Sequence, residues 1–66
     1  MAVMKSIQVM SESDESFEDA INNAIKRTAK SVDDIRSANI NNQSVTVKNG
    51  KIEKYRVNVN ITFEVN

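Results

Sequence analysis

The C-terminal segment alternates apolar and polar residues without a break from Tyr55 to Val65. Alternation with a period of two is typical of a β-strand that buries one face. The apolar face consists of Tyr55, Val57, Val59, Ile61, Phe63 and Val65, and the polar face of Arg56, Asn58, Asn60, Thr62 and Glu64. The pattern predicts a strand from about Ile52 to Val65 whose second face is polar and rich in amides.

The residues from Asp14 to about Lys30 follow a helical period instead. Their apolar members recur at spacings of three and four and form one stripe: Phe17, Ala20, Ile21, Ala24, Ile25 and Thr28. Such a stripe is typical of an amphipathic helix that packs through one face. Ser13 is the predicted N-cap, since Asp14 and Glu15 then lie in the first turn, where the helix dipole favours negative charge.

Two further strands are expected on either side of this helix. Apolar and polar residues alternate at Met4–Met10, which predicts a short strand. A longer strand at Ile35–Lys48 alternates less regularly, and its parity changes between Ile40 and Val45. This change predicts a β-bulge near residues 41–43.

The dipeptide Asn49-Gly50 predicts a tight hairpin between the two long strands, and it holds the only glycine of the chain. The order β-α-β-β then predicts an α+β fold, in which a three-stranded antiparallel sheet wraps on one amphipathic helix. Residues 1–66 are expected to form a single domain. The last strand spans roughly 45 Å and the helix only about 24 Å, so apolar sheet surface is left for another subunit.

The amino-acid composition argues against several classes of function. The chain has 66 residues, no cysteine and no histidine, and nine basic residues balance nine acidic ones. Because phosphate binding favours a basic surplus, nucleic acid is not an expected partner. Without histidine or cysteine, no spacing assembles a catalytic pair, so no enzymatic activity is expected. No apolar run could span a membrane and no signal peptide is visible, so a cytoplasmic protein that gains stability by self-association is expected.

Three segments, taken in order, resemble one known family, the dodecins: KSIQVMSESDESFEDAINNAI, SVDDIRSANI and NGKIEKYRVNVNITFEV. The resemblance covers nearly the whole chain. Dodecins are small β-α-β-β proteins that assemble into hollow homododecamers, with the helices outside and the sheets around an interior. The resemblance implies a non-enzymatic binding or storage protein whose last strand turns its polar face toward that interior.

Most dodecins bind flavins (riboflavin, FMN or FAD) between tryptophans of neighbouring subunits, and a glutamine on the last strand contacts the ring. By the resemblance, the tryptophan position is Ser37 here, and the glutamine position, next to Tyr55, is Arg56. Losing two stacking tryptophans removes several kcal/mol at about 25 cal/mol per Å². A micromolar site amounts to only about 8 kcal/mol, so weak or absent flavin binding is expected.

A tryptophan-free branch of the family is described as calcium-binding, and the SVDDIR segment and the Tyr-Arg pair resemble that branch. Calcium takes six to eight oxygens, typically including carboxylates. The candidate ligands are Asp33, Asp34 and Glu64, with Glu12, Asp14, Glu15 and Glu53 as further carboxylates. In the plainer interpretation, the two aspartates form a solvated turn and the acids near the helix start complement its dipole.

Arg56 also has two interpretations. It forms an ion pair between subunits with Glu53, Glu64 or an aspartate of a neighbour, or it contacts an anion or ligand in the interior. Three functions therefore remain open: a dodecin-type shell for a small ligand, a calcium-binding member of the same fold, and an oligomer without a ligand.

Overall fold

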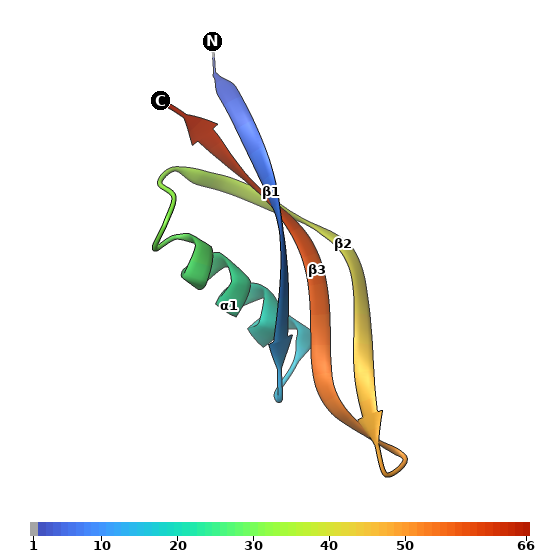
Figure 1. Ribbon diagram of the computed structural model, residues 1–66. Helices are drawn as coiled ribbons and strands as arrows, with labels where there is room; N and C mark the ends of the chain where they lie inside the picture. The colour runs from blue at the N-terminus through green and yellow to red at the C-terminus, as the bar shows by residue number, and fades with distance from the viewer. Residues whose placement is uncertain (1) are drawn as a thin grey trace.

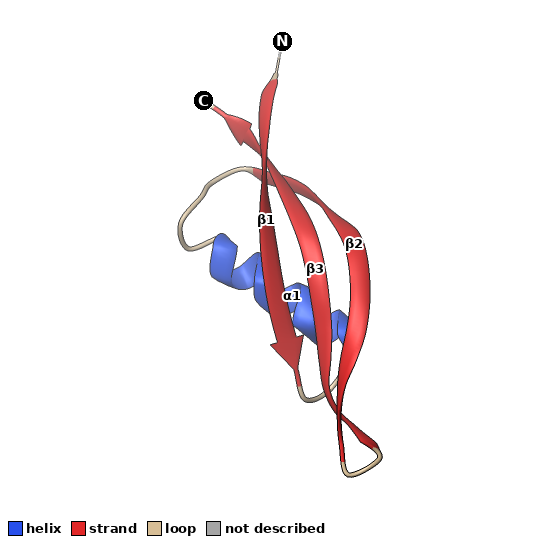
Figure 2. Ribbon diagram, turned by 45° about the vertical axis from the view of Figure 1, so that its right-hand side comes forward, coloured by secondary structure: helices blue, strands red, loops and turns tan. Residues whose placement is uncertain are grey.

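The computed structural model describes residues 2–66 and has four elements in the order β-α-β-β (Figure 1). They are β1 (Val3–Ser13), α1 (Phe17–Thr28), β2 (Ile35–Lys48) and β3 (Lys51–Val65). The strands form one antiparallel sheet in the order β1-β3-β2, and α1 lies across one of its faces (Figures 1 and 2). The predicted α+β fold is confirmed. Within residues 2–66, no helix has both the length and the apolar character that crossing a membrane requires.

β3 is the central strand, and its apolar face forms the core. Val57, Val59 and Ile61 are fully buried, as the alternation predicts. α1 packs on this face through Ala20 and Ala24, whose short side chains hold the helix close to the sheet. Partly buried residues from β1, α1 and β2 pack around this centre: Ile7, Val9, Phe17, Ile21, Ile25, Ile35 and Ala38.

β2 is irregular where its sequence loses the alternation. Its pairing with β3 shifts register between Ile40 and Asn42, which confirms the predicted bulge, and shifts again near both ends of the strand. The hairpin that follows turns at Asn49 and Gly50, with φ angles of 54° and 74°. Both angles lie in the left-handed region that a two-residue type I′ turn requires, and glycine adopts it at no steric cost.

The helix begins later than the sequence predicts. β1 does not end at Met10 but continues to Ser13, which lies opposite Tyr55 in the ladder. The prediction of Ser13 as N-cap is therefore wrong. The cap is Ser16, whose hydroxyl accepts the backbone N–H of Asp19 at 2.9 Å. Both serines are good caps by type, and pairing of β1 with β3 decides between them.

Ser13 instead connects the end of β1 to the helix through hydrogen bonds. Its buried hydroxyl donates to the carboxylate of Asp19 at 2.6 Å and accepts the N–H of Glu15 at 2.9 Å. The acids in the first helical turn are accordingly Glu18 and Asp19, and Asp14 and Glu15 precede the helix. The dipole is still complemented, but by acids placed four residues further along the chain.

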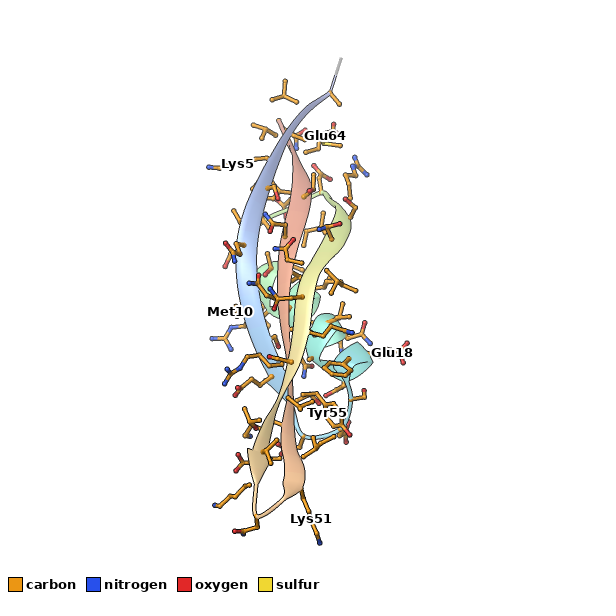
Figure 3. All side chains as sticks on the ribbon, turned by 90° about the vertical axis from the view of Figure 1, so that its right-hand side faces the viewer. Lys5, Met10, Glu18, Lys51, Tyr55 and Glu64 are labelled. Carbon is orange, nitrogen blue, oxygen red and sulfur yellow. The ribbon has the colours of Figure 1, made fainter. Side chains whose placement is uncertain are left out.

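The sheet extends well beyond α1, as the predicted lengths require. The molecule measures 51 × 20 × 13 Å, and the β2–β3 hairpin projects past the start of the helix (Figures 1 and 3). Large apolar side chains are exposed along the strands of the sheet: Val3, Met4, Met10, Ile40, Val45, Val47, Ile52 and Val65. A single chain thus leaves apolar surface uncovered at both ends of its sheet.

Replacing Ser16 with alanine should lower the free energy of unfolding by about 1 kcal/mol, because the N–H of Asp19 loses its acceptor. Urea denaturation followed by circular dichroism, at one fixed protein concentration, measures the change. Ser31→Ala, a matched substitution beyond the end of α1, should change stability by less than about 0.5 kcal/mol. Equal losses in the two variants would contradict the assignment of the cap.

Candidate functional site

The face of the sheet turned away from α1 carries the polar half of the alternation, and we call it the open face. Figure 2 shows that α1 lies behind the sheet and leaves this side uncovered. From β3 it presents Arg56, Asn58, Asn60, Thr62 and Glu64, and residues of β1 and β2 lie opposite them in the ladder. On the open face, polar groups of β1, β2 and β3 are therefore presented together.

A cluster of amide side chains occupies the middle of the open face. At its centre, Nδ2 of Asn41 donates to Oδ1 of Asn60 at 2.5 Å and to Oδ1 of Asn58 at 3.3 Å. Nε2 of Gln8 donates to the same Asn58 oxygen, and Nδ2 of Asn39 donates to Oδ1 of Asn41, both at 2.9 Å. This amide cluster joins all three strands without any charged group.

The bulge in β2 explains how Asn41 reaches the centre of the cluster. The register shift between Ile40 and Asn42 leaves Asn41 without a partner of its own in β3. An extra residue in one strand changes the direction of its side chain, and here the side chain lies between Asn58 and Asn60. The change of parity in the sequence is thus the local signal of the amide cluster.

An ion pair between Arg56 and Glu12 lies at one end of the open face. The two residues are cross-strand partners in β3 and β1. Nε and Nη2 of Arg56 both donate to Oε2 of Glu12, at 2.8 and 2.5 Å. Sequence reasoning missed Glu12 as the partner because it ended the first strand at Met10. Once β1 is extended to Ser13, the pairing follows from the register.

A second ion pair, between Arg36 and Glu64, lies at the other end, with Nη2 and Oε1 3.2 Å apart. The N–H of Glu64 donates to the carbonyl of Asp34 at 3.0 Å, and Oδ2 of Asp34 accepts from Nδ2 of Asn66 at 2.6 Å. Two candidate calcium ligands thus lie on adjoining segments, while Asp33 is exposed before β2. Within residues 2–66, no three acidic side chains are grouped closely enough to hold a metal ion.

The residues at the flavin-site positions lie apart in one chain. Ser37 pairs with Thr62 of β3, and Arg56 lies roughly 20 Å further along that strand at about 3.3 Å per residue. Tyr55 points to the helix side, where its ring packs edge-to-face on Phe17 with centroids 5.1 Å apart and planes at 79°. Ser37 and Arg56 are therefore too far apart within one chain for their side chains to touch.

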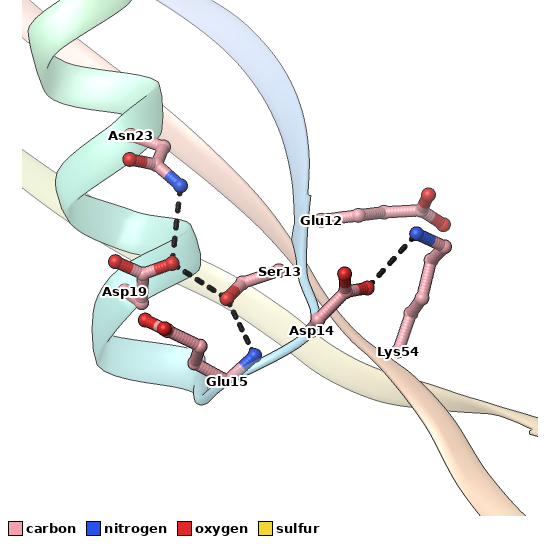
Figure 4. A pocket seen from close by; sticks show the side chains of 7 residues that line it. All are labelled: Glu12, Ser13, Asp14, Glu15, Asp19, Asn23 and Lys54. Atoms are coloured by element: carbon pink, nitrogen blue, oxygen red, sulfur yellow. Dashed lines mark hydrogen bonds and ion pairs between the residues drawn. The ribbon is translucent and has the colours of Figure 1, made fainter.

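Glu12, near the end of β1, lines two hollows of the described chain. The first, of about 530 Å³, is lined by Met10, Ser11, Glu12 and Arg56. The second, of about 400 Å³, lies where β1 leads into α1, and polar and acidic side chains surround Lys54 there (Figure 4). Nζ of Lys54 donates to Asp14 at 3.0 Å, and this hydrogen bond raises the pKa of Lys54. The lysine stays charged, and its solvent-exposed pair with Asp14 contributes little to stability.

Comparison with known proteins agrees with the family that the sequence resembles. The family model described as Dodecin matches residues 3–66. The calcium dodecin of Mycobacterium tuberculosis is 34% identical over 65 residues, which cover 98% of this chain and 92% of that protein.

Solved structures give the same picture. A crystal structure of calcium dodecin from M. tuberculosis, described as having a novel calcium-binding site, superposes with a TM-score of 0.84 at 37% identity. The match covers 97% of this chain and 91% of that one. A mutant of the T. thermophilus dodecin reaches a TM-score of 0.95 at 21% identity, covers 100% and 98% of the two chains, and shares the fold.

Proposed function

The chain belongs to the dodecin family, and we propose that it forms a cytoplasmic homododecamer that binds or stores a small ligand without catalysing a reaction. The observation that carries this proposal is the uncovered apolar surface at the two ends of the sheet. Val47 and Ile52, near the hairpin, are 64% and 55% exposed, and Val3, at the far end, is 59% exposed.

Self-association is the means by which so small a chain can bury these residues. A domain of about 60 residues buries only about 60% of the surface that its unfolded chain exposes. Exposed apolar patches of this kind are typical of subunit contacts, and a closed symmetric assembly buries the same patch in every copy. In the dodecin arrangement α1 lies outside and the open face lines the interior, so the amide cluster and its flanking ion pairs meet the ligand.

The chemistry of the open face supports binding without catalysis. Arg36 and Arg56 are each paired with a carboxylate, and amides, which neither take up nor release protons near neutral pH, lie between them. The chain has no histidine or cysteine to act as base or nucleophile. The hydroxyl of Ser13, although bonded to Asp19, already accepts the N–H of Glu15 and serves the local structure.

The proposed ligand is not a flavin held in the usual family mode. Ser37 offers no ring for stacking, and Arg56 is engaged by Glu12. Tyr55 is no substitute, because its ring packs on Phe17 on the helix side of the sheet. We expect riboflavin, FMN and FAD to bind weakly or not at all.

Calcium is the second candidate ligand, favoured by the 34% identical relative named calcium dodecin. Asp34 and Glu64 lie on adjoining segments and Asp33 precedes them. The carboxylates of one chain fall short of the six to eight oxygens that calcium takes. Neighbouring copies would have to complete the set, and near a three-fold axis of the assembly one Glu64 becomes three.

Replacing Val47 with aspartate should disrupt assembly, because a charge buried at a subunit contact loses its hydration. Light scattering during size-exclusion chromatography should give the mass of a dodecamer for the natural chain and smaller species for the variant. The concentration at which the assembly dissociates should rise at least about tenfold, or 1.4 kcal/mol. Asn22→Asp, on the exposed side of α1, adds the same charge and should leave the mass unchanged. A monomeric natural chain would contradict the proposed assembly.

Ser37→Trp combined with Arg56→Gln should create or strengthen flavin binding, since it restores both side chains of the family site. Quenching of riboflavin fluorescence measures the gain, which should be at least about tenfold in affinity. Ser31→Trp with Arg56→Gln places the tryptophan beyond the end of α1 and should give no such gain. An assembled Ser37→Trp/Arg56→Gln variant that leaves riboflavin fluorescence unchanged would show that the flavin positions are assigned wrongly.

Calcium should raise the melting temperature, by an amount equivalent to about 2.7 kcal/mol when its concentration is a hundredfold above the dissociation constant. Magnesium at the same concentration is the control for ionic strength, since it retains its water shell more firmly. Glu64→Gln should remove the calcium-specific shift, whereas Glu53→Gln, the same charge change on the same strand, should keep it. Identical shifts with the two ions would count against calcium as the ligand.

A further inference from the structure

The hollow at the end of β1 combines an apolar surface with a cation. Its volume of about 530 Å³ falls within the range of roughly 300–1,000 Å³ that is usual for small-molecule sites. Met10 is 69% exposed there and lies opposite Asn58 in the ladder. Met10 therefore gives this part of the open face an exposed apolar side chain beside the polar groups of Glu12 and Arg56.

The cation in this hollow is already engaged. Arg56 directs Nε and Nη2 to Oε2 of Glu12, at 2.8 and 2.5 Å. The guanidinium fork fits carboxylate and phosphate oxygens in the same way. Glu12 therefore engages two of the guanidinium N–H groups and places a negative charge beside them. Lys54, in the adjoining hollow, is likewise paired with Asp14.

Elsewhere on the open face, the other arginine is also paired with a carboxylate. Arg36 is paired with Glu64 at the far end of the face. The amide cluster between the two arginines presents donors and acceptors but no net charge. A negatively charged molecule thus meets no unpaired arginine on this face, while an uncharged molecule meets both hydrogen-bonding groups and an apolar side chain.

We infer that Glu12 is the specificity-determining residue of this hollow: by neutralising Arg56, it restricts the site to uncharged small molecules that place an apolar part on Met10. The inference rests on the proposed binding function and names the class of ligand. Removing the charge of Glu12 should turn the same hollow into an oxyanion site, since no carboxylate then neutralises Arg56.

Inorganic pyrophosphate is the probe, because it offers oxyanions and no apolar part. Titration calorimetry should detect no saturable binding to the natural chain, whereas Glu12→Gln should bind pyrophosphate saturably. Glu53→Gln makes the same change in net charge on β3, away from Arg56, and should behave like the natural chain. Glu12→Gln/Arg56→Gln should lose the gain, because no guanidinium remains in the hollow.

Saturable binding of pyrophosphate by the natural chain would overturn the inference, as would equal gains in Glu12→Gln and Glu53→Gln. A folded Glu12→Gln variant that does not bind pyrophosphate would also overturn the inference. Glu12→Ala repeats the test with a shorter side chain. Light scattering on the same samples reports assembly separately, so a failure of the proposed dodecamer remains distinguishable from a failure of the role of Glu12.

Discussion

Burial of one face of β3 is the constraint on which the rest of the structure depends. Full burial of a valine or isoleucine side chain contributes about 1.5–3 kcal/mol, and β3 buries Val57, Val59 and Ile61 completely. Because successive residues of a strand point to opposite sides, this burial commits Arg56 and Asn58 to the open face. A slip of one residue would exchange the two sets, so the core also fixes the register of the binding surface.

Local signals in the sequence predict most of the fold. The alternation in β3, the stripe of α1, the change of parity in β2 and the Asn49-Gly50 turn each depend on residues close together in the chain. The start of α1 was missed because several serines precede it, and pairing of Ser13 with β3 selects Ser16 as the cap. Such a choice depends on contacts more than forty residues away, which no local pattern contains.

The candidate site is less predictable than the fold, for the same reason. The polar composition of the open face is visible in the alternation, but the partner of Arg56 is set by the cross-strand register, and the position of Asn41 by a bulge. The proposed contacts of Ser37 and Glu64 depend in addition on other copies of the chain. Pairing each arginine of the open face within its own chain has a further merit, since many such faces could line one interior without accumulating like charge.

The strand order β1-β3-β2 also has a consequence for biosynthesis. β3 is translated after β1 and β2 yet becomes the middle of the sheet, and β1 and β2 make no ladder with each other. While the nascent chain emerges, α1 has no complete sheet to cover and its apolar stripe stays in contact with water. Folding that relies on distant pairings is slow compared with helix formation. The sheet therefore forms only after β3 has left the ribosome, and a chain whose translation stops before β3 leaves the apolar stripe of α1 without the strand face on which it packs.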